Sequence, residues 1–238
     1  MTPDSLPELM AQAARDLQHQ SGTDATMQTA VDVALRDIDG AEAIGLSMVT
    51  RRREVETLAA TAPEARLADV LQYRHDEGPC LDAVWEHRVV HSRDLRQESR
   101  WPRWAAQASA ETGYRSMMAF QLFTTSDRLG ALNLYSTQVD GFDTTDRDHG
   151  LALAAHISVA VRSAQQIQNL QAALDSRTVI AQAVGILMER YDLEPDGAFS
   201  VLTRVSTTTN SKLRDLAEQL CTTGGLPHLG DGSGAATG

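Results

Sequence analysis

Residues 174–220 read LDSRTVIAQAVGILMERYDLEPDGAFSVLTRVSTTTNSKLRDLAEQL, a stretch whose pattern predicts three consecutive helices. In the third, apolar residues recur at i, i+3, i+4 and i+7, namely Leu213, Leu216, Ala217 and Leu220. This spacing is typical of a helix that buries one face. Pro195 suits the first turn of the second helix, because the N–H that proline lacks would be unpaired there. The polar residues 206–209 separate the second helix from the third. We therefore expect an all-α bundle of three helices.

Upstream of this stretch, one long helix is predicted to follow the capping sequence at 143–146. From Ile157 onward, small and apolar residues recur at alternating spacings of three and four, a pattern typical of a coiled coil. The residues of this expected dimer seam are Ile157, Ala160, Ala164, Ile167, Leu174 and Ala181. Gln171 and Thr178 interrupt it. The pattern favours a parallel homodimer through a connecting helix at 145–176, and the alternative is an amphipathic helix packed on its own domain.

The N-terminal two thirds of the chain mixes helices and strands. Residues 1–22 predict a helix that ends at a polar break, and a second helix follows. Strand-like runs occupy 43–49, 55–60, 89–91, 116–124 and 129–136. Strands joined by short turns pair antiparallel, because a parallel pair needs a longer crossover. We therefore expect an α+β domain at 23–165, with an antiparallel sheet flanked by helices.

Composition and charge describe an ordinary globular protein. Of its 238 residues, 42% are hydrophobic and 22% charged, which is enough to bury a core. The formal net charge of −11 excludes a generally basic surface, so any nucleic-acid contact has to come from a local patch, and no DNA partner is expected. Residues 224–238 contain six glycines, which predicts a disordered tail.

The sequence favours a reducing, cytoplasmic environment. The two cysteines, Cys80 and Cys221, are far apart, unlike those of a zinc ribbon or a disulfide framework. The sequence contains neither a signal peptide nor an apolar run of about 20 residues, the length that spans a bilayer. We therefore expect a cytoplasmic protein with no membrane partner.

Common catalytic motifs are absent from the sequence. It contains no GxxxxGK[ST] phosphate loop, no GxGxxG, no GxSxG and no HExxH. His87 and His91 lie four residues apart, but no third ligand is evident, so no metal is expected. The sequence therefore favours a protein that is not an enzyme.

A candidate small-molecule pocket lies in the middle of the α+β region. Its expected lining residues are Trp101, Trp104, Phe120 and Cys80. Ligands usually bind in such apolar hollows between a sheet and its helices, and core packing is the alternative. Phe120 and Phe123 are expected to face opposite sides of one strand. Cys80, near a helix start, either has a lowered pKa or packs as a small buried side chain.

The residues that make the C-terminal stretch specific are Arg177, Ala183, Gly185, Met188, Ala198, Phe199, Leu202, Ser206, Asn210 and Ala217. With them, residues 167–223 resemble the ANTAR domain, an RNA-binding module of transcription antitermination regulators. Residues 23–165 resemble a GAF sensor domain through EGPC at 77–80, WP at 101–102 and LGALNLY at 129–135. GAF followed by ANTAR is a familiar arrangement in actinobacterial regulators.

The resemblance implies a signal-responsive dimer that binds paired RNA hairpins overlapping a terminator and promotes transcription antitermination. The GAF-like domain would sense a small molecule that the sequence does not identify. Two alternatives stay open. The bundle either binds RNA or is a degenerate module that binds another protein. A catalytic GAF-like domain, as in methionine sulfoxide reductases of that fold, would need several cysteines around one pocket.

Five residues of the ANTAR-like stretch are candidate RNA contacts, namely Arg177, Gln182, Asn210, Lys212 and Arg214. Asn210 is as well placed to cap or brace the bundle. Val184 stands where many relatives carry lysine, and residues 167–223 contain five basic and seven acidic residues, a net charge of −2. We expect weak intrinsic RNA affinity that dimerisation makes useful. Ala183 and Gly185 are expected to permit close helix approach.

Overall fold

The computed structural model describes residues 5–50, 54–85, 89–125 and 128–226. The chain divides into two compact units, Met1–Gln168 and Asn169–Gly238, which are described separately below. His87 and most of the glycine-rich tail lie outside the described residues. None of the helices in the described ranges, the 48-residue α6 included, has a segment long and apolar enough to cross a membrane.

The first unit is built on an antiparallel sheet whose strand order is β2-β1-β5-β4-β3. The strands are β1 (Ala43–Val49), β2 (Val55–Ala60), β3 (Val89–Ser92), β4 (Ser116–Thr125) and β5 (Arg128–Ser136). The longest pairing joins β4 to β5, in the register Phe120 opposite Leu132. The predicted antiparallel sheet is confirmed.

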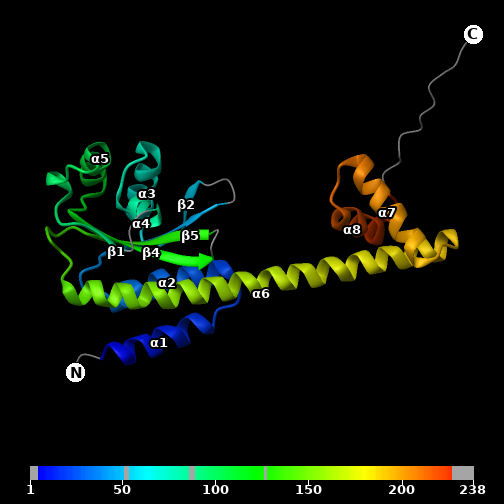
Figure 1. Ribbon diagram of the computed structural model, residues 1–238, viewed down its shortest axis with the longest axis horizontal. Helices are drawn as coiled ribbons and strands as arrows, with labels where there is room; N and C mark the ends of the chain where they lie inside the picture. The colour runs from blue at the N-terminus through cyan, green and yellow to red at the C-terminus, as the bar shows by residue number, and fades with distance from the viewer. Residues whose placement is uncertain (1–4, 51–53, 86–88, 126–127, 227–238) are drawn as a thin grey trace, which may run out of the picture. The chain divides into compact units, whose positions relative to one another are not determined.

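Helices cover both faces of this sheet (Figure 1). One face is covered by α2 (Thr23–Asp37) and the first part of α6 (Thr144–Tyr191), and α1 (Leu6–Gln18) packs on α2 on the side away from the sheet (Figure 1). The other packs against α3 (Pro63–His75), α4 (Pro79–Trp85) and α5 (Pro102–Thr112), with the short 3-10 helix η1 (Leu95–Gln97) beside them. Since alternate residues of a strand face opposite sides, each strand contributes to both cores.

Gly150 lets α6 approach the sheet closely. A Cβ atom at this position would lie 2.2 Å from Cζ of Phe120 on β4, a distance that no side chain tolerates. The helix continues along the sheet through Leu153, Ile157 and Val161, all buried. This part of α6 is therefore an amphipathic helix packed on its own domain, as the alternative interpretation held.

Ile157 is accordingly wrong as a dimer-seam residue. Its side chain is 0% exposed and belongs to the core between the sheet and α1, α2 and α6. The heptad pattern placed it on a seam because a core-facing stripe and a coiled-coil seam share the same spacing. Further along α6 the apolar side chains reach solvent, and Ile167, Leu170 and Leu174 are 62%, 66% and 63% exposed.

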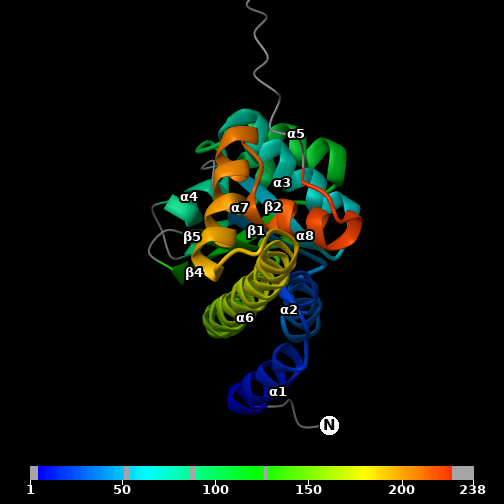
Figure 2. The ribbon, with the colours of Figure 1, turned by 90° about the vertical axis from the view of Figure 1, so that its right-hand side faces the viewer.

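The second unit is the expected helical bundle. The C-terminal part of α6 packs with α7 (Pro195–Thr209) and α8 (Leu213–Thr223), and Figure 2 shows α7 and α8 beside the end of α6. The buried residues are Ala183, Leu187, Ala198, Leu202, Ala217 and Leu220. The apolar stripe predicted on the third helix is confirmed, since Leu216, Ala217 and Leu220 are buried and Leu213 is half-buried.

Candidate functional site

The five candidate RNA contacts are all exposed side chains of the second unit. Arg177 and Gln182 lie on α6, Asn210 ends α7, and Lys212 and Arg214 stand at the start of α8. They therefore come from three helices, and all five side chains reach solvent.

An open groove of about 570 Å³ connects part of this set. Arg177, Val184 and Gly185 of α6 line it, together with Phe199 of α7 and Leu213 of α8. Of the candidate cations, Arg177 lines the groove, whereas Lys212 and Arg214 flank the lining residue Leu213 in the chain. Gln182 and Asn210 are not among its lining residues.

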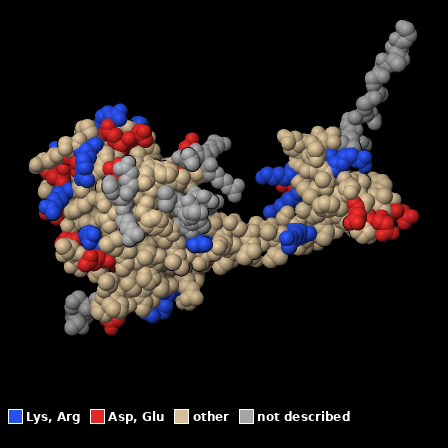
Figure 3. All heavy atoms as spheres, viewed as in Figure 1, with Lys and Arg blue, Asp and Glu red and all other residues tan. Residues whose placement is uncertain are grey.

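The cations near the groove differ in their partners. Nε of Arg214 donates a hydrogen bond to Oε1 of Glu218 at 2.8 Å, and this ion pair raises the pKa of the arginine. No described carboxylate lies within salt-bridge distance of Arg177 or Lys212. On the face drawn in Figure 3, acidic side chains of this unit gather near the turn from α6 into α7, and basic ones lie away from it. Arg177 and Lys212 are therefore the cations best able to bind a phosphate.

Asn210 has a clear structural role. It adopts the left-handed backbone conformation that ends α7, with φ 50°, and its backbone N–H donates to the carbonyl of Ser206. Asparagine tolerates this conformation better than most residues. The expectation that Asn210 caps the bundle thus agrees with the structure.

Ala183 and Gly185 behave differently from each other. Ala183 is fully buried in the bundle core, as expected of a residue that permits close helix approach. A Cβ atom on Gly185, in contrast, would meet no described heavy atom within 4 Å apart from the helix's own backbone. The expectation of close helix approach at Gly185 is therefore wrong within this chain.

Phe199 is a groove residue that was expected only as part of the ANTAR resemblance and not as a candidate contact. Its ring is 46% exposed, while its neighbour Ala198 points into the bundle core. The signal was present in the sequence, because Phe199 lies beside the buried α7 stripe of Ala198, Leu202 and Val205 and not on it.

The four residues expected to line one pocket of the first unit do not come together. Trp101, Trp104 and Cys80 lie between the sheet and α3, α4 and α5, with the two indole rings edge to face at 6.1 Å. Phe120 belongs to the opposite face, against α6. The alternation of β4 causes the split, and Phe123, on the other face from Phe120 as expected, is exposed.

Cys80 is a buried thiol. Burial, and secondarily the charge of Asp69, raises its pKa to about 12. The expectation of a lowered pKa is wrong. At this fully buried position, desolvation of the thiolate raises the pKa more than the N-terminal end of the short helix α4 lowers it. The alternative, that Cys80 packs as a small buried side chain, is confirmed.

A buried polar cluster lies on the same side of the sheet. The carboxylate of Asp69 accepts hydrogen bonds from Thr57 at 2.9 Å, from Asn133 at 2.8 Å and from the hydroxyl of Tyr135. Burial raises the pKa of Asp69 to about 6 against the opposing effect of these hydrogen bonds. This cluster was not among the sequence-based expectations, although an aspartate between Ala68 and Leu71, on a helix that buries both of them, was a detectable signal.

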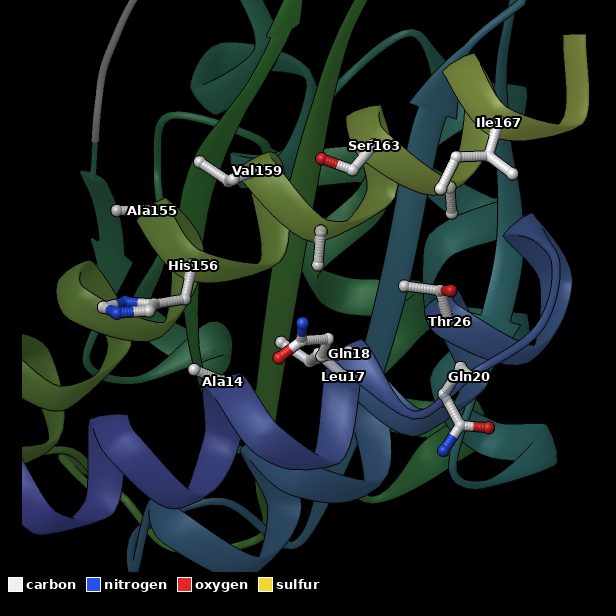
Figure 4. A pocket seen from close by; sticks show the side chains of 12 residues that line it. Ala14, Leu17, Gln18, Gln20, Thr26, Ala155, His156, Val159, Ser163 and Ile167 are labelled. Atoms are coloured by element: carbon white, nitrogen blue, oxygen red, sulfur yellow. The ribbon is translucent and has the colours of Figure 1, made fainter. Parts of the chain in front are cut away.

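A second groove, of about 690 Å³, runs between α1 and α6 within the first unit. Three expected seam residues, Ala160, Ala164 and Ile167, line it on α6, and Leu17 lines it on α1. Figure 4 shows the labelled side chains of the two helices along its sides. The exposed part of the expected seam therefore continues into an apolar groove.

Comparison with known proteins identifies both units. The GAF domain family model matches residues 20–162, and the ANTAR domain model matches residues 168–220. A comparison with curated proteins finds no match.

Solved structures show the same fold as the first unit. The free methionine-R-sulfoxide reductase from Neisseria meningitidis matches with a TM-score of 0.54 and 16% identity, over 68% of this chain and 91% of that one. The GAF domain of a phosphoenolpyruvate-protein phosphotransferase from Coxiella burnetii matches with a TM-score of 0.54 and 12% identity, over 69% and 96%. The sheet, the helix layers and the two family matches together place this chain in the GAF family, as a GAF and ANTAR domain-containing regulator.

Proposed function

We propose that the protein is a signal-responsive homodimer that binds paired RNA hairpins and promotes transcription antitermination. The observation that carries RNA binding is Arg177, an exposed cation that lines the ANTAR groove and has no described carboxylate partner. RNA sequence is read mainly in loops, where unstacked bases meet aromatic and polar side chains while cations hold the phosphates. The local placement of Arg177 and Lys212 supports such contacts in spite of the net charge of −2.

Dimerisation is supported by the exposed part of α6. Residues 163–174 contain no charged side chain, yet Ile167, Leu170 and Leu174 are largely exposed. In a parallel, in-register pair the seam residues meet their own copies and the flanking residues lie near those of the partner, so an uncharged segment brings no like charges together. We propose that Ala160, Ala164, Ile167 and Leu174 contribute to the seam, without Ile157.

Two linked bundles gain from effective concentration. When one bundle binds the first hairpin, the second bundle meets the second hairpin as an intramolecular event, provided that the spacing fits. Weak single contacts then suffice for tight binding of a tandem RNA.

The GAF domain is the proposed sensor. Its candidate ligand region lies on the α3, α4 and α5 side of the sheet, where Trp101, Trp104 and Cys80 adjoin the cluster around Asp69. Because α6 is one helix from Thr144 to Tyr191, a change in its pairing in the GAF part extends into the ANTAR part. A signal then acts by shifting the population of dimers competent for two hairpins.

The reductase-like alternative has little chemical support. A methionine sulfoxide reductase reaction needs a thiolate nucleophile, whereas burial holds the only cysteine of the GAF unit, Cys80, in its protonated form. GAF followed by ANTAR is a regulatory architecture, and we propose that the protein is not an enzyme.

The test is RNA selection followed by binding measurements. A pool of tandem-hairpin RNAs with randomised loops is passed over the full chain, and the enriched RNA is compared with its two single-hairpin halves at rising salt. We expect the tandem RNA to bind more tightly than either half, with an affinity that falls steeply with salt.

Variants complete this test. Arg177→Ala and Lys212→Ala are expected to weaken binding, and Arg204→Ala serves as the control, because Arg204 is an exposed α7 cation that does not line the groove. A folded dimer that enriches no RNA at low salt would overturn the proposal and favour the protein-interaction alternative.

A further inference from the structure

Gly185 lies inside α6, and nothing in the described chain requires a glycine there. A glycine inside a helix costs about 0.5–1 kcal/mol relative to alanine. At Gly150 the neighbouring Phe120 ring explains the glycine, since a Cβ atom would clash with it. At Gly185 a Cβ atom would enter open space in the groove of the ANTAR unit. The glycine therefore keeps this part of the groove open.

The other lining residues indicate what occupies that room. Phe199 presents a half-exposed aromatic ring on one side, with Met188 and Leu213 as further apolar surface. Arg177 adds an unpaired guanidinium, and Asp196 adds a carboxylate that accepts hydrogen bonds. An aromatic ring, an apolar surface and a nearby cation are the components with which proteins hold single-stranded nucleic acid.

We infer that this groove takes one unstacked base of an RNA loop, stacked on Phe199 above Gly185. Arg177 binds the adjoining phosphate, and Asp196 accepts a hydrogen bond from an N–H group on the edge of the base. The inference rests on the proposed RNA-binding function and assigns its base-binding residues.

A second copy of the chain fits the groove less well. An in-register pair through these positions would place Gly185 on the seam, where it offers no side chain to pack into the partner helix. We therefore end the dimer seam at Leu174 and assign Ala181, which also lines this groove, to the RNA-binding surface.

The first experiment separates stacking from apolar bulk, using the full chain and a tandem-hairpin RNA that the unmodified protein binds. Phe199→Leu keeps an apolar side chain but removes the ring, and it is expected to lower affinity about 5- to 150-fold, the range measured for losing one stacked base. Phe199→Tyr is expected to retain affinity. Tyr191→Leu is the matched control, because Tyr191 is an exposed aromatic residue that does not line the groove.

The second experiment fills the groove. Gly185→Leu adds a side chain where a Cβ atom meets nothing, so the variant is expected to fold with an unchanged or higher Tm and to lose RNA affinity. An RNA with an abasic nucleotide at each loop position in turn identifies the bound base. At that position the abasic RNA is expected to bind the unmodified protein and Phe199→Leu equally, because the stacked base is already missing.

The outcomes distinguish this inference from the function on which it rests. If the unmodified protein binds the tandem RNA and both Phe199→Leu and Gly185→Leu bind equally well, the groove assignment is wrong and RNA binding stands. If Gly185→Leu becomes monomeric while it still binds a single hairpin, the groove is a dimer contact and the inference is overturned. If the unmodified protein binds no RNA, the proposed function is wrong, and the groove inference that rests on it is wrong as well.

Discussion

Asn133 donates a hydrogen bond from Nδ2 to Oδ1 of Asp69 at 2.8 Å, and both side chains are fully buried between β5 and α3. This contact joins the central strand β5 to α3 across the sheet face that we propose for ligand sensing. Gly45 makes it possible, since a Cβ atom there would lie 2.4 Å from Oδ2 of Asp69. This side of the GAF core is therefore organised around a carboxyl group and not around apolar packing alone.

Asp69 is expected to make stability depend on pH. Its pKa is raised to about 6 in the folded protein, above the value of about 3.9 in an unfolded chain. The folded state therefore binds the proton more tightly. The stabilising contribution of Asp69 to folding is thus complete below pH 4 and is lost as pH rises through 6. The free energy of unfolding falls by at most about 3 kcal/mol over this pH range.

Asp69→Asn isolates this effect. Asparagine retains the oxygen that accepts from Asn133 and does not ionise, so the variant should gain stability relative to the unmodified protein between pH 4 and pH 7. Urea denaturation of both proteins at several pH values measures the difference. A difference that stays constant over this range would show that Asp69 titrates alike in both states.

Ile157→Ala is expected to destabilise the GAF unit by about 2–5 kcal/mol, because it leaves a cavity in the core between the sheet and α6. Chemical denaturation followed by tryptophan fluorescence measures the loss, since all three tryptophans belong to this unit. Val139→Ala, at a half-exposed position, is the control and should change stability little. If Ile157→Ala were instead as stable as the unmodified protein but monomeric, Ile157 would belong to the dimer seam after all.

Leu174→Lys is expected to weaken the dimer without unfolding the chain. Leu174 is a proposed seam residue, 63% exposed on α6 within the uncharged segment 163–174, and a lysine there would face its own copy in a parallel pair. Sedimentation velocity should show a monomer at concentrations at which the unmodified protein is a dimer. Val139→Lys supplies the same charge away from α6, and equal dissociation in both variants would argue against this seam.

The two cysteines are expected to differ in reactivity. Cys221 is exposed, whereas burial raises the pKa of Cys80 to about 12, and only thiolates react quickly with disulfide reagents. Titration of the native protein with such a reagent should release one equivalent rapidly, and a second should appear on denaturation. Two rapid equivalents would mean that Cys80 is accessible, and would reopen the reductase-like alternative.

Local patterns of the sequence sufficed for the elements themselves. The spacing of Leu213, Leu216 and Leu220 determines which face of α8 is apolar, and strand-like runs separated by short turns determine an antiparallel sheet. Both rest on interactions between residues close in the chain, and the GAF and ANTAR resemblances depend on motifs of the same local kind.

What covers each apolar face was decided only by the tertiary structure. Ile157 and Leu174 share one heptad pattern, yet the sheet buries Ile157 and leaves Leu174 exposed. In the same way, the pleat of β4 separates Phe120 from Trp104. Periodicity states which residues share a face but carries no information about the distant segment that packs on it. The raised pKa of Asp69 and the open space at Gly185 likewise arise from the positions of residues far away in the chain, so neither was visible before the chain folded.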